Sequence, residues 1–152
     1  MDTQPESNTF MRWGRISLYG VALNFLGEGV ISLIAPAKLT PLVEIAMPTR
    51  AAVMELRAVY GGFFFGTGLF FVLFARRDSW LRPGLIAQAC IFGGFVLARA
   101  LSIVIGDAPN LFIAALTIAE VIGLAVALVL LRGLDSDARL AAHPGITGRM
   151  GS

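Results

Sequence analysis

Four long apolar segments constrain this chain more than any other feature of its sequence. A helix needs about 20 mostly apolar residues to cross the hydrocarbon core of a bilayer. Four stretches have that length: residues 15–35, 51–75, 83–106 and 109–131. A span surrounded by lipid must satisfy its backbone hydrogen bonds internally, so each stretch is expected to be a helix. The chain is therefore predicted to be all-α, a four-transmembrane-helix bundle with up-down-up-down topology.

The composition agrees with a membrane protein. Of the 152 residues, 57% are hydrophobic and 14% are charged, whereas soluble domains carry about 25% charged residues. The formal charge of +2 comes from arginines beside the apolar segments, which form no basic face. We therefore expect a lipid bilayer as the surroundings and no nucleic acid as a partner.

The chain divides into three predicted regions. Residues 1–14 form a polar N-terminal tail, residues 15–132 form the four-helix membrane domain, and residues 133–152 form a flexible cytoplasmic tail. The only sizeable connection between spans is residues 36–50, which contains three prolines.

The distribution of arginines predicts the orientation. Four spans put both termini on one side, and that side has eight arginines, whereas the other has only Lys38 and Arg50. The eight are Arg12, Arg15, Arg76, Arg77, Arg82, Arg132, Arg139 and Arg149. The positive-inside rule then predicts that both termini lie in the cytoplasm. The alternative is that the first segment is a signal peptide cleaved near Ala35, although Glu28 interrupts its apolar run.

Five ionisable residues fall inside the predicted spans: Glu28, Glu55, Arg57, Arg99 and Glu120. At a rise of about 1.5 Å per residue, all five lie in the half of their span that faces the 36–50 connection. An unpaired charge at the centre of a span costs at least about 2.5–3.5 kcal/mol. We therefore expect a shared cluster on one level. Depth matching pairs Glu28 with Arg57, and it pairs Glu120 with Arg99.

Three acids against two arginines leave one carboxylate without a cation. Two alternatives remain open: Glu55 is in water at the interface, or Glu120 is protonated because burial disfavours its charged form.

Three further polar residues are placed near this cluster. Asn24 shares a helix face with Glu28, Ser102 shares one with Arg99, and Tyr60 is one turn from Arg57. Together these residues would surround a small outward-facing pocket that binds a ligand. The alternative is that they only satisfy one another.

Several glycines are predicted to let helices approach closely, because they lack a Cβ atom. G-x-x-x-G patterns of this kind serve either packing within the chain or a dimer face. The predicted packing glycines are Gly61, Gly62, Gly66, Gly68, Gly93, Gly94 and Gly123.

Much of the chemistry of known enzymes is missing from the spans. They contain no histidine, which excludes haem ligation by His and the Glu-x-x-His di-iron pattern. A single cysteine, Cys90, excludes a thiolate metal site. No catalytic triad and no phosphate-binding loop is visible. We expect no metal and no cofactor, and no residue is singled out as catalytic.

The sequence from Glu55 to Gly68 follows the pattern E-x-R-A-x-Y-G-G-x-x-x-G-x-G, and a G-G-F-x-x-x-R pattern ends at Arg99. With Glu120 in the last span, these motifs resemble domain-of-unknown-function family 4345, small bacterial four-helix membrane proteins. The resemblance covers about residues 16–132. It implies the same number of spans and draws attention to the same charged residues, but it implies no reaction and no substrate.

Three functions are compatible with these observations. The first is binding of a small polar or lipid-headgroup-like molecule, or of protons, at the Glu/Arg cluster. The second is a structural accessory subunit of a larger membrane complex, docked through glycine and phenylalanine faces. The third is an isomerase-type membrane enzyme.

Overall fold

The computed structural model describes residues 4–142, which form helices and no strand. The elements are α1 (Gln4–Ile34), the 3₁₀ helix η1 (Pro36–Lys38), α2 (Arg50–Leu56), the π-helix η2 (Arg57–Phe63), α3 (Phe64–Ala75), α4 (Asp78–Ile105) and α5 (Leu111–Ala142). Since α2, η2 and α3 follow without a break, the described chain has four long helical segments. The predicted all-α, four-helix fold is confirmed.

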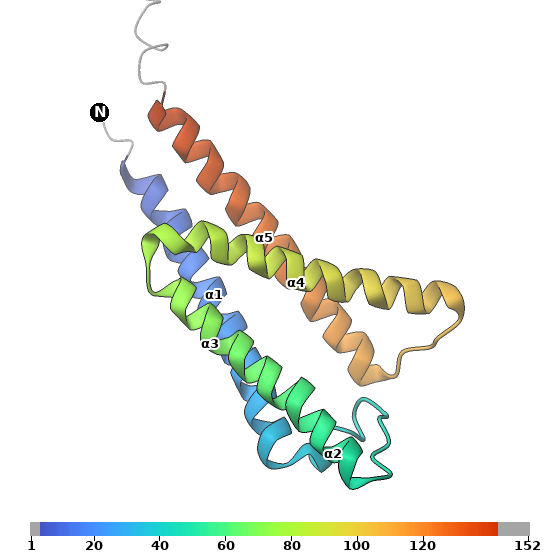
Figure 1. Cartoon of the computed structure of the whole chain (residues 1–152). Helices are drawn as coiled ribbons and strands as arrows, with labels where there is room; N and C mark the ends of the chain where they lie inside the picture. Colours follow the sequence, from blue (N-terminus) through green and yellow to red (C-terminus); the bar gives the residue numbers. More distant parts are fainter. Residues whose placement is uncertain (1–3, 143–152) are drawn as a thin grey trace, which may run out of the picture.

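Each long segment contains a stretch long and apolar enough to cross a membrane. These stretches are Thr9–Ile34, Arg50–Ala75, Asp78–Ile105 and Leu111–Asp137. Figure 1 shows that the start of α1 and the end of α5 lie at the same end of the molecule, here called the terminal end. The opposite end, called the loop end, carries the connections 35–49 and 106–110.

The helices form two antiparallel pairs. α1 lies alongside η2 and α3, and α4 packs against α5 (Figure 1). α4 crosses the bundle and diverges from α3 towards the loop end (Figure 1). Several of its large apolar side chains are exposed there. Leu97 is 71% exposed and Val104 is 82% exposed. The bundle is therefore closed at the terminal end and splayed at the loop end.

The packed core lies in the terminal half. Leu18, Phe71 and Leu85 are completely buried there. Phe25 lies where this core meets the loop half, and its ring stacks on the rings of Phe71 and Phe92 with centroids 6.1 and 6.4 Å apart. Aromatic pairs of this kind add about 0.5–1.5 kcal/mol beyond the area they bury.

Close glycine contacts hold α1 against the second segment. A Cβ atom on Gly61 would lie 2.8 Å from the side chain of Leu33, and one on Gly68 would lie 2.6 Å from Leu26. Gly29 is tighter still, because its Cβ would lie 2.5 Å from the backbone nitrogen of Phe65. The backbones can approach this closely only because no side chain intervenes.

The predicted packing glycines divide into three groups. Gly61, Gly68 and, on α5, Gly123 lie at tight contacts, whereas Gly93 has only ordinary contact with Leu124. The remaining three have no contact with another helix, so the intrachain packing predicted for them is absent: Gly62, Gly66 and Gly94. These three face the outside of the bundle. Gly29 and Gly84 pack tightly and were not predicted.

Helix ends carry conventional caps at the loop end. Thr49 caps α2, because its Oγ1 accepts a hydrogen bond from the amide of Ala52 at 3.1 Å. Gly106 ends α4 with φ of +109°, a left-handed conformation that glycine adopts without a Cβ penalty. Asn110 Oδ1 accepts from the amide of Ile113 at 2.8 Å, while its Nδ2 donates to the Leu42 carbonyl at 3.0 Å. Asn110 therefore ties the two loop-end connections together.

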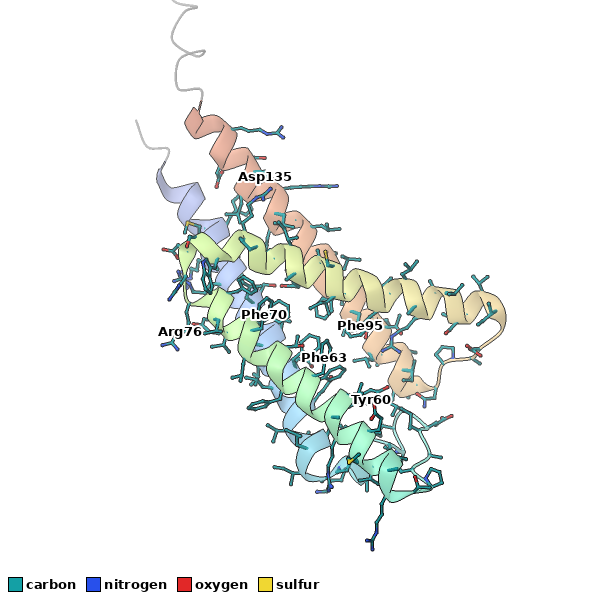
Figure 2. All side chains as sticks on the ribbon, in the orientation of Figure 1. Tyr60, Phe63, Phe70, Arg76, Phe95 and Asp135 are labelled. Atoms are coloured by element: carbon teal, nitrogen blue, oxygen red, sulfur yellow. The ribbon has the colours of Figure 1, made fainter. Side chains whose placement is uncertain are left out.

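Helix extends into both regions predicted as tails. α1 begins at Gln4 and α5 continues to Ala142. Gly133 packs against Phe10, and the Arg82 Nε donates to Asp135 Oδ1 at 2.9 Å. Figure 2 labels Asp135 on this part of α5. These contacts between helices hold the extension of α5 in place. The remainder of the predicted tails, with His143 and Arg149, lies outside the described residues.

Candidate functional site

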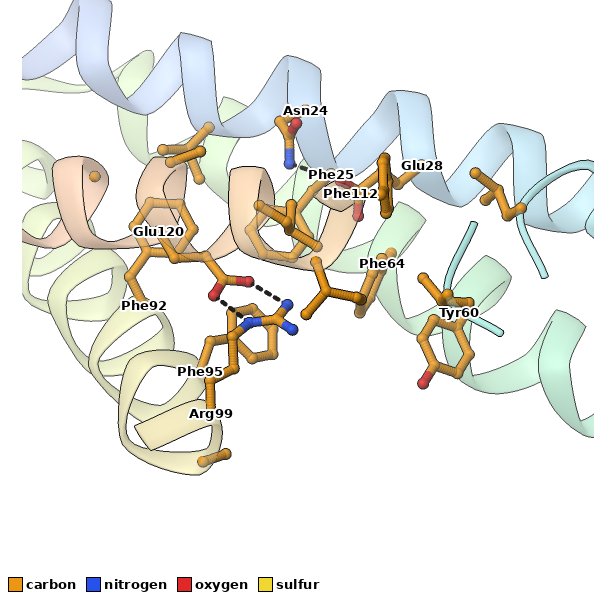
Figure 3. Close-up of a pocket in the computed structure, with 18 of the residues that line it drawn as sticks. Asn24, Phe25, Glu28, Tyr60, Phe64, Phe92, Phe95, Arg99, Phe112 and Glu120 are labelled. Carbon is orange, nitrogen blue, oxygen red and sulfur yellow. Dashed lines mark hydrogen bonds and ion pairs between the residues drawn. The ribbon is translucent and has the colours of Figure 1, made fainter. Parts of the chain in front are cut away.

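A cavity of about 710 Å³ lies between the helices in the loop half of the molecule (Figure 3). All four long segments and residues 39–45 of the first connection contribute to its walls. Ligand pockets for drug-sized molecules measure about 300–1,000 Å³. The splayed end of the bundle is therefore roomy enough for a small organic molecule.

An ion pair between α4 and α5 lies in the cavity wall. Arg99 Nε donates to Glu120 Oε2 at 2.6 Å, and Arg99 Nη2 donates to Oε1 at 2.8 Å (Figure 3). The two side chains are 24% and 7% exposed. Two parallel charge-assisted hydrogen bonds are the strongest arrangement open to these groups. The predicted pairing of Glu120 with Arg99 is present, and both carboxylate oxygens accept from the guanidinium.

The second predicted pair, Glu28 with Arg57, does not form. Arg57 is exposed, and its Nε donates to the backbone carbonyl of Leu33 at 3.1 Å. Leu33 is in the last turn of α1, where carbonyls have no partner within the helix. A cation is favourable there because the C-terminal end of a helix carries a partial negative charge.

The register between α1 and the second segment explains the failure. Leu33 lies opposite Gly61, and Gly29 lies opposite Phe65. This register puts Glu28 on the level of Gly66, nine residues or about 13 Å along the helix from Arg57. The depth estimate assumed that neighbouring helices end at one level. In fact α2 extends well beyond the end of α1.

Glu28 forms no salt bridge with the described residues. Its Oε1 accepts a hydrogen bond from Asn24 Nδ2 at 3.1 Å, and both residues line the cavity (Figure 3). Glu55 is exposed and does not line the cavity. Of the three acids in the predicted spans, two thus have no salt bridge within the described residues: Glu55, which is exposed as the first alternative expected, and Glu28, which lines the cavity.

Tyr60 and Ser102 also line the cavity, as expected for a ring of polar groups. Tyr60 belongs to η2, and its ring packs against Phe64 with centroids 5.6 Å apart. π-helical segments are rare and frequently occur at functional sites. The site residues predicted from sequence that surround the cavity are Asn24, Glu28, Tyr60, Arg99, Ser102, Glu120 and Gly123.

Sequence reasoning missed a polar floor at the inner end of the cavity. Gln88 of α4 is 1% exposed, accepts from Ser17 Oγ at 3.1 Å and donates to the Gly123 carbonyl at 2.9 Å. These bonds connect α4 with α1 and α5. The signal was available, because Gln88 is the only glutamine within the four predicted spans.

The rest of the wall is largely aromatic. Phe25, Phe64, Phe92, Phe95 and Phe112 line the cavity and come from all four long segments. Rings of this kind offer apolar area and a negative face to a ligand. The arrangement suits an apolar molecule that carries a polar group.

Sequence comparison identifies the family. The model of a family described as Domain of unknown function (DUF4345) matches residues 14–131. The chain belongs to this family. Neither a curated protein nor a solved structure matches the chain significantly. The DUF4345 match includes every residue of the cavity wall, so the site lies inside the family domain and its function has to be argued from its own chemistry.

Proposed function

We propose that this DUF4345 protein is a multi-pass protein of the bacterial inner membrane, with both termini in the cytoplasm, that binds a small molecule in its loop-half cavity. The molecule has an apolar part and a polar or headgroup-like part. The observation that carries the proposal is the cavity itself, in which charged groups from three helices are set into an aromatic wall.

The energetics of the wall favour a binding role. Isolated polar groups within membrane segments are costly, and they commonly mark ligand or ion sites. Arg99 and Glu120 would need no open cavity if they served only to fasten α4 to α5. They are instead fixed at the cavity surface, where they can orient a polar group by hydrogen bonds while the phenylalanines cover its apolar part.

A cavity-filling substitution tests the proposal. Ala98 lines the cavity, whereas Ala100, on the same helix, does not. The protein is extracted in mild detergent, and bound small molecules and lipids are identified by mass spectrometry. The expected result is a stoichiometric molecule that is lost from Ala98→Trp and retained by Ala100→Trp. A molecule retained equally by both variants, or no bound molecule in the wild-type protein, would contradict it.

The orientation has its own test. Fluorescent-protein and alkaline-phosphatase fusions to the C-terminus report on which side of the inner membrane it lies. A fluorescent first fusion and an inactive second one are expected for a cytoplasmic terminus. The reverse pattern would exclude the proposed orientation.

A second candidate function rests on the outward glycines. Gly62 and Gly66 lie one turn apart on the exposed side of the second segment, with no other helix against them. A helix of another membrane protein could pack there, as expected for an accessory subunit. In the same purification, a stoichiometric protein that is lost from Gly66→Leu would support this function.

A further inference from the structure

A polar stripe along α1 forms one side of the cavity. Asn24, Glu28 and Ser32 follow at intervals of four residues, so they share one face of the helix, and all three line the cavity. Asn24 Nδ2 donates a hydrogen bond to Oε1 of Glu28. Within residues 4–142, no lysine or arginine side chain forms a salt bridge with Glu28. The stripe therefore presents a carboxylate without a salt bridge. Arg99 acts on it from a distance, but the guanidinium hydrogen bonds of Arg99 go to Glu120.

Ser32 is a second incomplete group on the stripe. It is 1% exposed, and in the described part of the chain its Oγ has no hydrogen-bond partner. A buried hydroxyl without a partner costs about 1–3 kcal/mol. Ser32 lies one turn from Glu28 and lines the same cavity, so a donor group bound between the two side chains would give a partner to each of them.

The charges around the cavity sum to a negative value. Arg99 and Glu120 neutralise each other through their two hydrogen bonds. Glu28 then leaves one formal negative charge in the wall, and Tyr60 adds an uncharged phenol. The aromatic faces attract cations too, because the negative face of a ring interacts favourably with an ammonium or guanidinium group.

We infer that the cavity selects a cationic amphiphile: a molecule with an apolar body and an ammonium or similar hydrogen-bond-donating head. This inference rests on the proposed function and names the ligand class. The head binds Glu28 and Ser32, and the body lies against Phe25, Phe64 and Phe95. A ligand with an anionic head would meet an unpaired carboxylate and is disfavoured.

Three probes that differ only in their head group test the inference. They are 4-phenylbutylamine, 4-phenylbutanol and 5-phenylpentanoate, which share a phenyl ring on a tetramethylene chain, and they are measured at neutral pH by equilibrium dialysis against the protein in phosphatidylcholine nanodiscs, with empty nanodiscs subtracted. Because hydrogen bonds to charged groups are the stronger ones, the amine is expected to bind at least about tenfold more tightly than the alcohol. The carboxylate is expected to bind most weakly.

Variants assign the selectivity to the stripe. Glu28→Gln should bring the amine to within about twofold of the alcohol while the alcohol binds as before, and Ser32→Ala should weaken the amine about two- to fivefold. Glu55→Gln, the same change outside the cavity, should alter the binding of neither the amine nor the alcohol. Ala98→Trp should remove the binding of all three probes.

The outcomes separate the two levels of the proposal. Equal binding of the three probes, or tightest binding of the carboxylate, would overturn the inferred ligand class and leave a binding cavity. No binding above empty nanodiscs would count against the cavity function as well. The ranking of probes on the wild-type protein needs no variant, so it decides the matter even if Glu28→Gln fails to fold.

Discussion

Gly29→Ala should be the most damaging single-methyl change in the described chain, because it acts on the tightest backbone contact between α1 and the second segment. The added Cβ would lie 2.5 Å from the backbone nitrogen of Phe65 and 2.8 Å from its Cα. Ordinary contacts of a Cβ begin at 3.4 Å, so the atoms overlap by about 1 Å. Backbone atoms cannot rotate away as a side chain can. The two helices must separate, or α1 must bend.

Gly27 gives a matched control two residues away. A Cβ on Gly27 would meet nothing within 4 Å. Gly27→Ala therefore shows the gain in helix propensity alone, about 1 kcal/mol at most. Gly29→Ala makes the same gain but also overpacks the interface, which typically costs about 1–3 kcal/mol. Because the propensity gain is common to both variants and cancels, the expected difference between them is the overpacking cost, about 1–3 kcal/mol in favour of Gly27→Ala.

The assay is unfolding in detergent micelles, followed by far-UV circular dichroism. Trp13 and Trp80 fluorescence gives a second probe. Gly29→Ala should unfold at a clearly lower temperature than the wild-type protein, and Gly27→Ala at the same or a slightly higher one. Equal midpoints for the two alanine variants would refute the close approach of α1 to Phe65 and the register derived from it.

Three further changes have defined outcomes, each measured as the free energy of unfolding in detergent. Arg99→Leu should cost about 3 kcal/mol, because it leaves Glu120 buried without its cation. The double variant Arg99→Leu/Glu120→Leu should cost less than Arg99→Leu alone. Additive costs of the two single changes would argue against the ion pair. Gln88→Leu should cost about 1–3 kcal/mol, because Ser17 loses its hydrogen-bond partner. An unchanged free energy of unfolding would show that the hydrogen bonds of Gln88 do not stabilise the fold. Gly106→Ala should cost about 1–2 kcal/mol from backbone conformation alone, since its Cβ would meet nothing.

Much of the fold follows from the sequence because lipid allows few solutions. Once four stretches are long and apolar enough to cross a bilayer, backbone hydrogen bonding requires helices, and short connections require antiparallel neighbours. The pairing of Arg99 with Glu120 follows as well. Their helices are consecutive and joined by a short connection, Gly106 to Asn110, so depths counted from that connection share one origin.

The same count fails for Glu28 and Arg57 because a long connection separates their helices. Residues 35–49 let α2 extend beyond the end of α1, so positions at equal counts lie at different levels. Glycine spacing misleads in a similar way. Gly62 and Gly66 have the familiar G-x-x-x-G spacing but face outward, whereas the contacts are made by Gly61 and Gly68. Spacing identifies a face of a helix, but only packing shows what that face meets.

The π-helix η2 gives the second segment a shift of phase. Leu56 and Gly61 are both buried although they are five residues apart, a spacing that would turn them about 140° from each other in a regular α-helix. The stretch is therefore equivalent to an α-helix with one inserted residue. Loss of a single residue within Arg57–Phe63 would restore the α-helical phase and leave α3 in place. The spacing from Leu56 to the position of Gly61 would become four residues, about 40° in an α-helix, so α2 would keep its orientation and move about 1.5 Å along the helix axis. The first connection, whose residues 39–45 contribute to the cavity wall, would move with it. Within the described chain, a one-residue change in length is thus a simple route by which this scaffold could alter access to its own interior.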